Sequence, residues 1–358
     1  MSETPTDGRA DDALLERERA HFGDLDARLG RVVVTGGGGF LGERIVALLR
    51  DLGVNEVTAV GRRRYERVLE LGANSVVADV ADGAALARAL AGADTVIHTA
   101  ALAGVFGPEA DFHRANVVGT RNVLAACSEH AIGRLVLTSS PSVVFDGTDH
   151  VDASNDLPYP ARYLAAYPRT KAEAERLVLA ANGPRLATVA LRPHLIFGPR
   201  DPHLVPRLMK RARAGRLRRV GSGANRVSLT FVDNAAWAHI DAAAQLHPGA
   251  AHGGRAYFVN QSEPVAVWDW IDRVLAGVGA PAAGRAVPGR TAYAAGAVCE
   301  GLWRVLPLRG EPPMTRFVAQ QLALEHTYSL APARRDFGYR ERVDLDEATA
   351  RTIAAFAR

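Results

Sequence analysis

A run of glycines between two apolar stretches constrains the fold of this 358-residue chain more than any other feature. The run, Thr35-Gly36-Gly37-Gly38-Gly39-Phe40-Leu41-Gly42, follows Val32-Val33-Val34 and leads into the amphipathic stretch 41–49. Its glycines satisfy both G-x-x-G-x-x-G and G-x-G-x-x-G. This order predicts a buried strand, a tight turn and a helix.

Such a turn suits a phosphate group. Glycine lets the backbone reverse sharply and approach a pyrophosphate without a Cβ in the way. The free N–H groups and the dipole at the helix start then attract the anion. A merely flexible turn is the alternative, but the flanking strand and helix favour a dinucleotide site. The residues expected to contact the dinucleotide here are Gly36, Gly39, Phe40, Leu41 and Gly42.

The end of the next apolar run indicates which dinucleotide binds. NAD-selective sites usually place an acidic residue there, to accept a hydrogen bond from the ribose 2′-hydroxyl. This chain instead reads Gly61-Arg62-Arg63-Arg64. Guanidinium groups at Arg62 and Arg63 suit a 2′-phosphate, so the sequence favours NADP(H). A solvated basic turn is the alternative.

Apolar runs alternate with helical patterns through the first half of the chain. The alternation predicts right-handed βαβ crossovers and an α/β, Rossmann-type doubly wound parallel sheet with helices on both faces. The runs lie at 32–35, 56–60, 75–78, 95–98, 134–138 and 187–191. Ligands of this architecture bind at the carboxyl ends of the strands. The residues expected there are Asp79, Val80, Thr99, Ala100 and Ala101.

The alternation breaks near Pro193, which predicts a division of the chain into three parts. Residues 1–30 form a polar tail that ends in a weakly amphipathic surface helix, with a partner-docking helix as the alternative. Residues 31–192 form the NADP-binding domain. Residues 193–358 form a smaller, mixed α/β substrate lobe, from which about 226–260 return to the first domain.

Composition agrees with a globular enzyme. Residues of apolar type make up 48% of the chain, and the net charge of +4 is small. The arginines are not interleaved with aromatic residues, so nucleic acid is not an expected partner. Cys127 and Cys299 imply neither a disulfide framework nor a metal site. Residues 1–30 lack an apolar signal core, and we expect a cytoplasmic protein, with peripheral membrane contact or a multi-enzyme assembly left open.

Tyr167-Pro168-Arg169-Thr170-Lys171 carries the predicted acid–base chemistry. Residues at i and i+4 share a helix face, and Pro168 is tolerated only in the first turn, so Tyr167 should face the cleft at the start of a helix. The Lys171 ammonium, together with an oxidised nicotinamide, should lower the pKa of the phenol. Tyr167 and Lys171 are therefore expected to contact the cofactor and to protonate a carbonyl as hydride arrives.

Ser140 follows the apolar run 134–138 and is expected to hold the carbonyl oxygen with its hydroxyl. The pattern Y-x-x-x-K also arises by chance, and a surface tyrosine near a lysine is the alternative. The glycine turn upstream and the serine after the fifth run favour the catalytic interpretation.

With these motifs, the chain resembles an extended short-chain dehydrogenase/reductase over nearly all of 31–358, within its 3β-hydroxysteroid dehydrogenase branch. Asn116-Val117-Val118-Gly119-Thr120-Arg121-Asn122-Val123 is similar to the helix that bears the active-site asparagine of that group, which places Asn116 in this role. The stretch 191–199 is similar to the segment that passes the nicotinamide, and this places Pro193 at the cofactor. The resemblance implies a triad of Ser140, Tyr167 and Lys171.

The substrate is indicated by one departure and one apolar segment. Nucleotide-sugar enzymes of this superfamily carry an arginine where Val227 stands, although Arg226 is adjacent. A diphosphate clamp is therefore not expected, and a lipid-like substrate is favoured. The apolar stretch 291–308 is too short and too charged to span a bilayer. Three roles remain open for it: lining an acyl channel, lying on a membrane surface or packing as core.

The stretches 310–317 and 331–339 resemble the reductases of bacterial long-chain olefin biosynthesis. This resemblance implies NADPH-dependent reduction of a 2-alkyl-3-oxoalkanoate to the 2-alkyl-3-hydroxyalkanoate, beside a thiolase, a β-lactone synthetase and a decarboxylase. A 3β-hydroxysteroid or sterol dehydrogenase and a non-catalytic NADP-binding scaffold are the alternatives, and a homodimer is left open.

A basic segment comes after the nicotinamide-passing stretch. It has two interpretations: a site for a substrate carboxylate or an anionic partner, or a solvated helix face, which is the commoner fate of such a segment. Its members are Arg207, Lys210, Arg211, Arg213, Arg216, Arg218 and Arg219.

Overall fold

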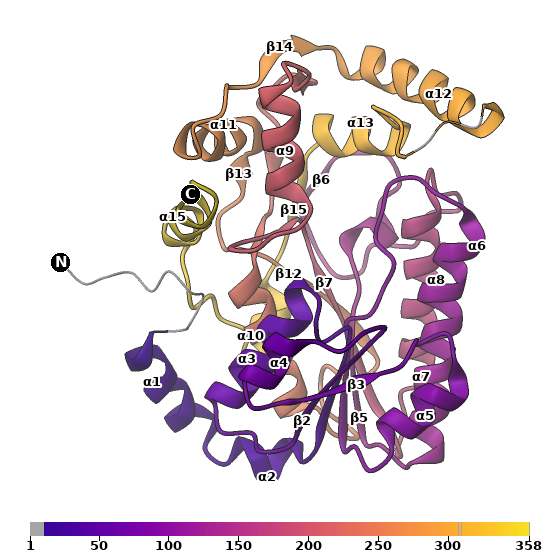
Figure 1. Ribbon diagram of the computed structural model, residues 1–358, viewed down its shortest axis with the longest axis vertical. Helices are drawn as coiled ribbons and strands as arrows, with labels where there is room; N and C mark the ends of the chain where they lie inside the picture. Colours follow the sequence, from indigo (N-terminus) through magenta and orange to yellow (C-terminus); the bar gives the residue numbers. More distant parts are fainter. Residues whose placement is uncertain (1–10, 307, 309, 358) are drawn as a thin grey trace.

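The computed structural model of the protein describes residues 11–306, 308 and 310–357, and it is built around one large sheet (Figure 1). Seven strands lie in the order β12-β7-β5-β4-β1-β2-β3, and every neighbouring pair is parallel. The strands are β1 (Val32–Thr35), β2 (Val57–Gly61), β3 (Asn74–Val77), β4 (Thr95–His98), β5 (Arg134–Thr138), β7 (Ala187–Pro193) and β12 (Arg255–Val259). The expected doubly wound parallel sheet is confirmed.

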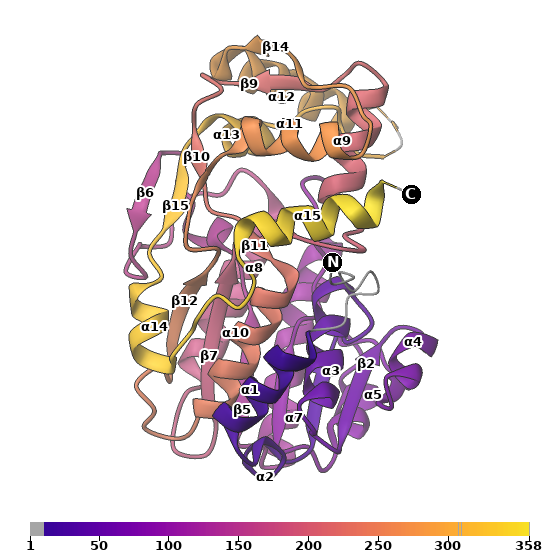
Figure 2. The same cartoon turned by 90° about the vertical axis from the view of Figure 1, so that its left-hand side faces the viewer.

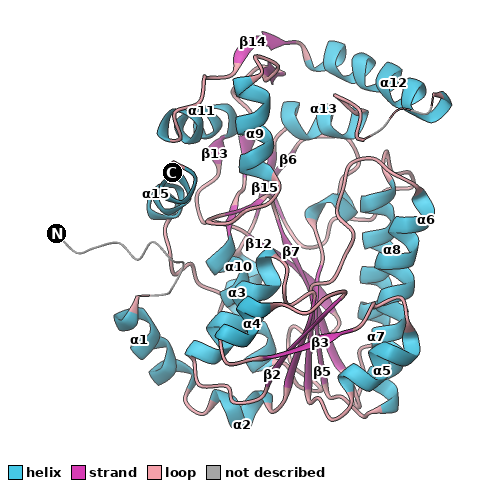
Figure 3. Cartoon of the chain, viewed as in Figure 1, coloured by secondary structure: helices cyan, strands magenta, loops and turns pink. Residues whose placement is uncertain are grey.

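Helices cover both faces of this sheet, which explains why its central strands read as continuous apolar runs. On one face lie α5 (Gly83–Leu90), α7 (Gly119–Glu129) and α8 (Ala166–Ala180), and on the other lie α3 (Phe40–Asp51) and α10 (Val232–Gln245) (Figure 3). The short elements of this half are α4 (Glu66–Glu70), α6 (Glu109–Phe112), the π-helix η1 (His113–Val118) and the 3-10 helix η2 (Pro141–Val144).

A second lobe lies above the carboxyl ends of the main strands (Figure 2). Its mixed sheet has the order β13-β10-β15-β6, and two small parallel pairs, β11–β8 and β14–β9, complete the strands. These strands are β6 (His150–Ala153), β8 (Ile196–Phe197), β9 (Arg218–Val220), β10 (Arg226–Val227), β11 (Thr230–Phe231), β13 (Val265–Ala266), β14 (Gly284–Val287) and β15 (His326–Tyr328). The helices of this lobe are α9 (Leu204–Arg213), α11 (Val267–Gly277), α12 (Gly289–Val305), α13 (Arg316–Ala323) and α15 (Leu345–Phe356). Helix α14 (Ala331–Phe337) instead packs beside β12 and α10 (Figure 2).

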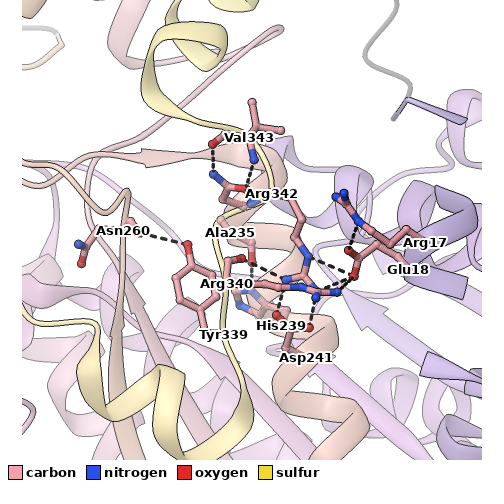
Figure 4. Close-up of polar contacts among 11 residues, drawn as sticks. Arg17, Glu18, Ala235, His239, Asp241, Asn260, Tyr339, Arg340, Arg342 and Val343 are labelled. Carbon is pink, nitrogen blue, oxygen red and sulfur yellow. Dashed lines mark hydrogen bonds and ion pairs between the residues drawn. The ribbon is translucent and has the colours of Figure 1, made fainter. Parts of the chain in front are cut away.

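The segment before β1 is more firmly attached than the sequence indicates. It forms two helices, α1 (Asp12–Phe22) and α2 (Leu25–Leu29), and Glu18 of α1 is fully buried. The Glu18 carboxylate accepts hydrogen bonds from Arg340 (2.6 Å) and Arg342 (2.9 Å), and Arg342 also binds Asp241 (Figure 4). The sequence predicted a short surface helix here, and the structure instead has two helices, each with buried residues on one side. The expected disordered tail falls mainly on residues 1–10, which lie outside the described residues.

The apolar stretch near residue 300 packs on the core only at its N-terminal end. In α12 only a narrow face is buried, formed by Ala292, Gly296 and Glu300, and Glu300 accepts a hydrogen bond from the backbone N–H of Arg316 at 2.7 Å. The opposite side exposes the large apolar residues Val298, Leu302 and Val305, followed by Leu306 and Leu308. Core packing, one of the three expected roles, therefore holds for the first part of α12, through Ala292 and Tyr293, and not for its exposed second half. In the part of the chain that the structure describes, no helix combines the length and apolar character needed to cross a bilayer.

Candidate active site

The glycine turn has the backbone that a phosphate-binding loop requires. Gly36 has a φ of 72°, in the left-handed region that side chains disfavour. A Cβ on Gly42 would stand 2.2 Å from the Gly36 carbonyl oxygen, so helix α3 can pack this closely on the turn only with glycine there. Gly39 caps α3 without any side-chain hydrogen bond. The N–H groups at the helix start therefore face the cleft, and they fit the pyrophosphate of a dinucleotide.

One cavity of about 570 Å³ joins this turn to the predicted catalytic residues. It runs from the carboxyl ends of β1, β4 and β5 into the second lobe. The sequence-predicted residues that line it are Gly36, Gly39, Phe40, Leu41, Gly42, Thr99, Ala101, Ser140, Tyr167, Lys171 and Pro193. Segments that are far apart in the chain thus meet in a single site.

Helix α8 presents Tyr167 and Lys171 to the cavity. It begins at Ala166, so Pro168 lies in the first turn as expected. The Lys171 ammonium donates a hydrogen bond to the Thr138 carbonyl oxygen, at the end of β5, at 2.5 Å. Ser140 caps η2, where its Oγ accepts hydrogen bonds from the backbone N–H and the hydroxyl of Ser142. The hydroxyl proton of Ser140 remains available for a second partner.

Burial shifts the pKa of both members of this pair. Burial lowers the pKa of Lys171 to about 8, although the Glu175 carboxylate opposes this shift. Burial raises the pKa of Tyr167 above its ordinary value, and a hydrogen bond with Ser140 offsets only part of the rise. The surrounding protein therefore favours the protonated form of Tyr167. The lowered phenol pKa was predicted for a site that also holds an oxidised nicotinamide, and it stays a prediction for that state. A protonated phenol is the form that can donate a proton.

A buried ion pair lies one helical turn beyond Lys171. The Glu175 carboxylate binds Arg192 of β7 through two contacts, 2.6 and 3.0 Å, and accepts a hydrogen bond from Tyr159 at 2.6 Å. Burial raises the pKa of Glu175, but Arg192 more than compensates and holds it below its usual range. Glu175 and Arg192 were not among the predicted site residues, although the i+4 spacing of Glu175 from Lys171 is a signal that could have indicated the carboxylate.

Asn116 lies beside the site and not in its wall. Its side chain accepts a hydrogen bond from the Leu102 N–H (2.7 Å) and donates to the Leu102 carbonyl oxygen (3.1 Å) and to the Thr170 hydroxyl (3.0 Å). Asn116 therefore links Leu102, in the loop after β4, to Thr170, which precedes Lys171. This geometry gives Asn116 a positioning role.

The remaining predicted cofactor residues lie outside the described cavity wall. Arg62 and Arg63 follow β2 and are exposed. Asp79 follows β3 with its carboxylate paired to Arg114 at 3.0 Å, and Val80 is buried against Gly119. The Ala100 backbone packs on the turn, because a Cβ on Gly36 would lie 2.8 Å from the Ala100 nitrogen.

The other end of the cavity belongs to the second lobe and is largely apolar. Its apolar wall comprises Leu195, Leu204, Leu208, Leu217, Trp268, Met314, Phe317, Val318 and Leu322. Val227 is fully buried, and Arg226 is exposed and donates to the Pro264 carbonyl oxygen at 2.7 Å. Neither is in the described wall, and none of the described wall residues belongs to α12.

This arrangement defines an oxidoreductase of the short-chain dehydrogenase/reductase type, which uses a nicotinamide dinucleotide to interconvert hydroxyl and keto groups. A sequence model of the 3-beta hydroxysteroid dehydrogenase/isomerase family matches residues 33–287, and the chain belongs to this family.

Three relatives are similar over most of the chain. The 2-alkyl-3-oxoalkanoate reductase of Stenotrophomonas maltophilia is 49% identical over 329 residues, which cover 91% of this chain and 99% of that protein. The protein of the same name from Shewanella oneidensis is 41% identical and covers 95% of this chain and 89% of its own. The "sterol-4-alpha-carboxylate 3-dehydrogenase, decarboxylating" of Mus musculus is 37% identical and covers 91% of both chains.

Solved structures share the architecture. MoeE5 in complex with UDP-glucose and NAD superposes with a TM-score of 0.69 at 25% identity, covering 90% of this chain and 97% of that chain. The crystal structure of gox2253 superposes with a TM-score of 0.74, also at 25% identity, covering 91% and 97%.

Proposed function

We propose that the protein reduces a 2-alkyl-3-oxoalkanoate to the 2-alkyl-3-hydroxyalkanoate, with NADPH as reductant, in long-chain olefin biosynthesis. Two relatives that span nearly the whole chain bear the name of this reductase. Under this proposal, a thiolase supplies the β-keto acid, and a β-lactone synthetase and a decarboxylase act after the reduction.

The observation that carries the proposal is the cavity itself. It joins the glycine turn to Tyr167 and Lys171 at one end and offers an apolar wall at the other. An apolar wall suits long alkyl arms, and the exposed Arg226 lies outside it, so a nucleotide-sugar diphosphate is not favoured.

Tyr167, Ser140 and Lys171 each have a different role in the proposed reduction. A bound reduced nicotinamide supplies the hydride that the keto carbon receives. Tyr167 donates its phenolic proton to the keto oxygen, and the Ser140 hydroxyl donates a hydrogen bond to the same oxygen. The Lys171 cation favours the phenolate that remains once the proton has left.

The test runs the reaction in the direction of oxidation, because a β-keto acid decarboxylates spontaneously. The purified protein is incubated with NADP⁺ and a 2-alkyl-3-hydroxyalkanoate, and separately with a 3β-hydroxysteroid, while reduced nicotinamide is followed by absorbance. We expect turnover of the hydroxy acid. Turnover of the steroid alone contradicts the proposal. Tyr167→Phe should lower turnover by about 10²- to 10⁴-fold and spare cofactor binding.

A sterol dehydrogenase is the second candidate. The family and the 37% identity to the sterol-4-alpha-carboxylate enzyme favour it, since that relative covers the same 91% of the chain. The parallel assay with the steroid separates the two candidates directly.

A further inference from the structure

Helix α9 turns part of its basic surface into the cavity. The described cavity wall includes Arg207 and Arg211, which are spaced i,i+4 and so share one helix face. Lys210 and Arg213 lie on the same helix but are exposed and outside that wall. Arg207 is also exposed, over 45% of its side chain, and Arg211 is partly buried, so the pair differs from Lys210 and Arg213 in lining the cavity and not in being shielded from solvent.

The two arginines contact the segment that follows α12. Arg207 Nη2 lies 2.5 Å from Glu311 Oε2, and Arg211 Nη2 lies 2.8 Å from the Pro313 carbonyl oxygen. A guanidinium group has five N–H donors, and these contacts use one terminal nitrogen of each. The pair therefore keeps donors for an incoming anion.

The arginine pair carries more positive charge than its neighbours neutralise. Burial lowers the pKa of Arg211, the Arg207 guanidinium lowers it further, and Glu311 opposes both. Among the described residues, Glu311 is the carboxylate that pairs with Arg207 and whose charge also acts on Arg211. A second carboxylate would relieve the repulsion between the two arginines, and the planar fork of arginine suits such a partner.

The position of the pair also suits a substrate acid. Glu311 Oε1 lies 3.8 Å from the point where a Cβ on Gly104 would stand, so the Arg207–Glu311 contact reaches the loop after β4. That loop supplies Ala101 and Val105 to the cavity wall. The Arg207–Glu311 contact therefore lies beside the loop that leaves the carboxyl end of β4.

We propose that Arg207 and Arg211 form a subsite that binds the carboxylate of the substrate. The inference rests on the proposed function, in which the acid group is separated from the keto carbon by a single carbon. The names of the reductase relatives and of the sterol relative both specify a carboxylate. The subsite selects acids over neutral ketones of the same shape, while the apolar wall holds the alkyl arms.

The test compares kcat/KM for two ligands in the native protein and in two double variants. The ligands are a 2-alkyl-3-hydroxyalkanoic acid and its methyl ester, which differ in the charged group alone. The variants are the double change Arg207→Gln/Arg211→Gln and its control Lys210→Gln/Arg213→Gln, which removes the same charge from the same helix.

We expect the Arg207/Arg211 variant to lose roughly 10- to 100-fold in kcat/KM for the acid, as expected for lost charge-assisted hydrogen bonds. Its kcat/KM for the ester, and both values of the control variant, should change by less than about threefold, as for surface substitutions. An unchanged acid-to-ester ratio in the Arg207/Arg211 variant overturns the subsite.

Calorimetry measures binding of the acid and the ester without turnover, so it tests the carboxylate subsite independently of the proposed function. If the native protein oxidises neither ligand, the proposed function fails, yet binding of the acid and the ester still decides the subsite. Tighter binding of the acid by the native protein, lost in the Arg207/Arg211 variant alone, supports it. Equal binding, or binding of neither ligand, overturns it.

Discussion

Lys171 illustrates how one residue sets the working pH of the site. Its pKa of about 8 means that the ammonium is charged below this value and loses its proton as the pH rises through it. We expect kcat/KM for the hydroxy acid to fall above about pH 8. Lys171→Arg keeps the charge, so the activity that remains should lack this alkaline limb. The same limb in both proteins would assign it to another group.

We expect Arg62 and Arg63 to favour NADPH over NADH. Replacing both with alanine should weaken NADPH binding by about 10- to 100-fold, because guanidinium contacts to the 2′-phosphate are lost, and should leave NADH binding nearly unchanged. Fluorescence titration of both cofactors measures this. The control is Arg64→Ala, since the Arg64 guanidinium is paired with Glu66 at 3.3 Å. Equal losses for both cofactors would contradict NADP selectivity.

The spacing of residues along the chain was enough to predict those site residues whose positions are set by a single turn or helix. Gly36 and Gly42, and the i,i+4 pair Tyr167 and Lys171, occupy the cavity wall because turn and helix geometry place them there. The contacts of Asn116 with Leu102 and of Arg207 with Glu311 could not be predicted in this way. They depend on how separate segments fold over one another, 14 and 104 positions apart.

At the scale of elements, the helix before β1 depends on a distant partner. Glu18 of α1 binds Arg340, which lies 322 positions later, and no local pattern reveals such a contact. The sequence therefore indicated a surface helix. Six strands of the main sheet could be placed to within two residues from their apolar runs, whereas β12 was not among those runs.

Glu18→Gln should destabilise the protein by up to about 3–5 kcal/mol, because it leaves the buried Arg342 with one fewer anionic partner. Glu16→Gln, an exposed change on the same helix, should alter stability by less than about 0.5 kcal/mol. Denaturant unfolding of the two variants measures the difference. Similar small effects would mean that the Glu18 network contributes little.

For the whole molecule, buried histidines predict sensitivity to acid. Burial lowers the pKa of His194 and His239 to about 4 and that of His98 and His326 to about 3. In the unfolded chain a histidine titrates near pH 6.5. Between about pH 6.5 and 4.5 the unfolded state therefore binds more protons than the folded state, in which these histidines stay neutral. Stability is therefore complete above this window and falls as the pH falls.

Each of these histidines should contribute a slope of about 1.4 kcal/mol per pH unit to the free energy of unfolding. Denaturant unfolding from pH 7.5 to 4.5 measures the total slope. His239→Gln should reduce it by about one such increment, and the exposed His247→Gln should not change it. A flat profile would show that these side chains are protonated in the native state.

The path of the chain between the two lobes limits how this enzyme can diversify. After β7 the chain builds part of the second lobe, returns as α10 and β12 to complete the large sheet, and leaves again. A fragment that ends at residue 192 would expose the edge of β7 and the apolar side of α3. No single cut point in the described part of the chain therefore separates the nucleotide-binding lobe from the second lobe. New specificities have to arise in place, by substitutions in the walls that already exist.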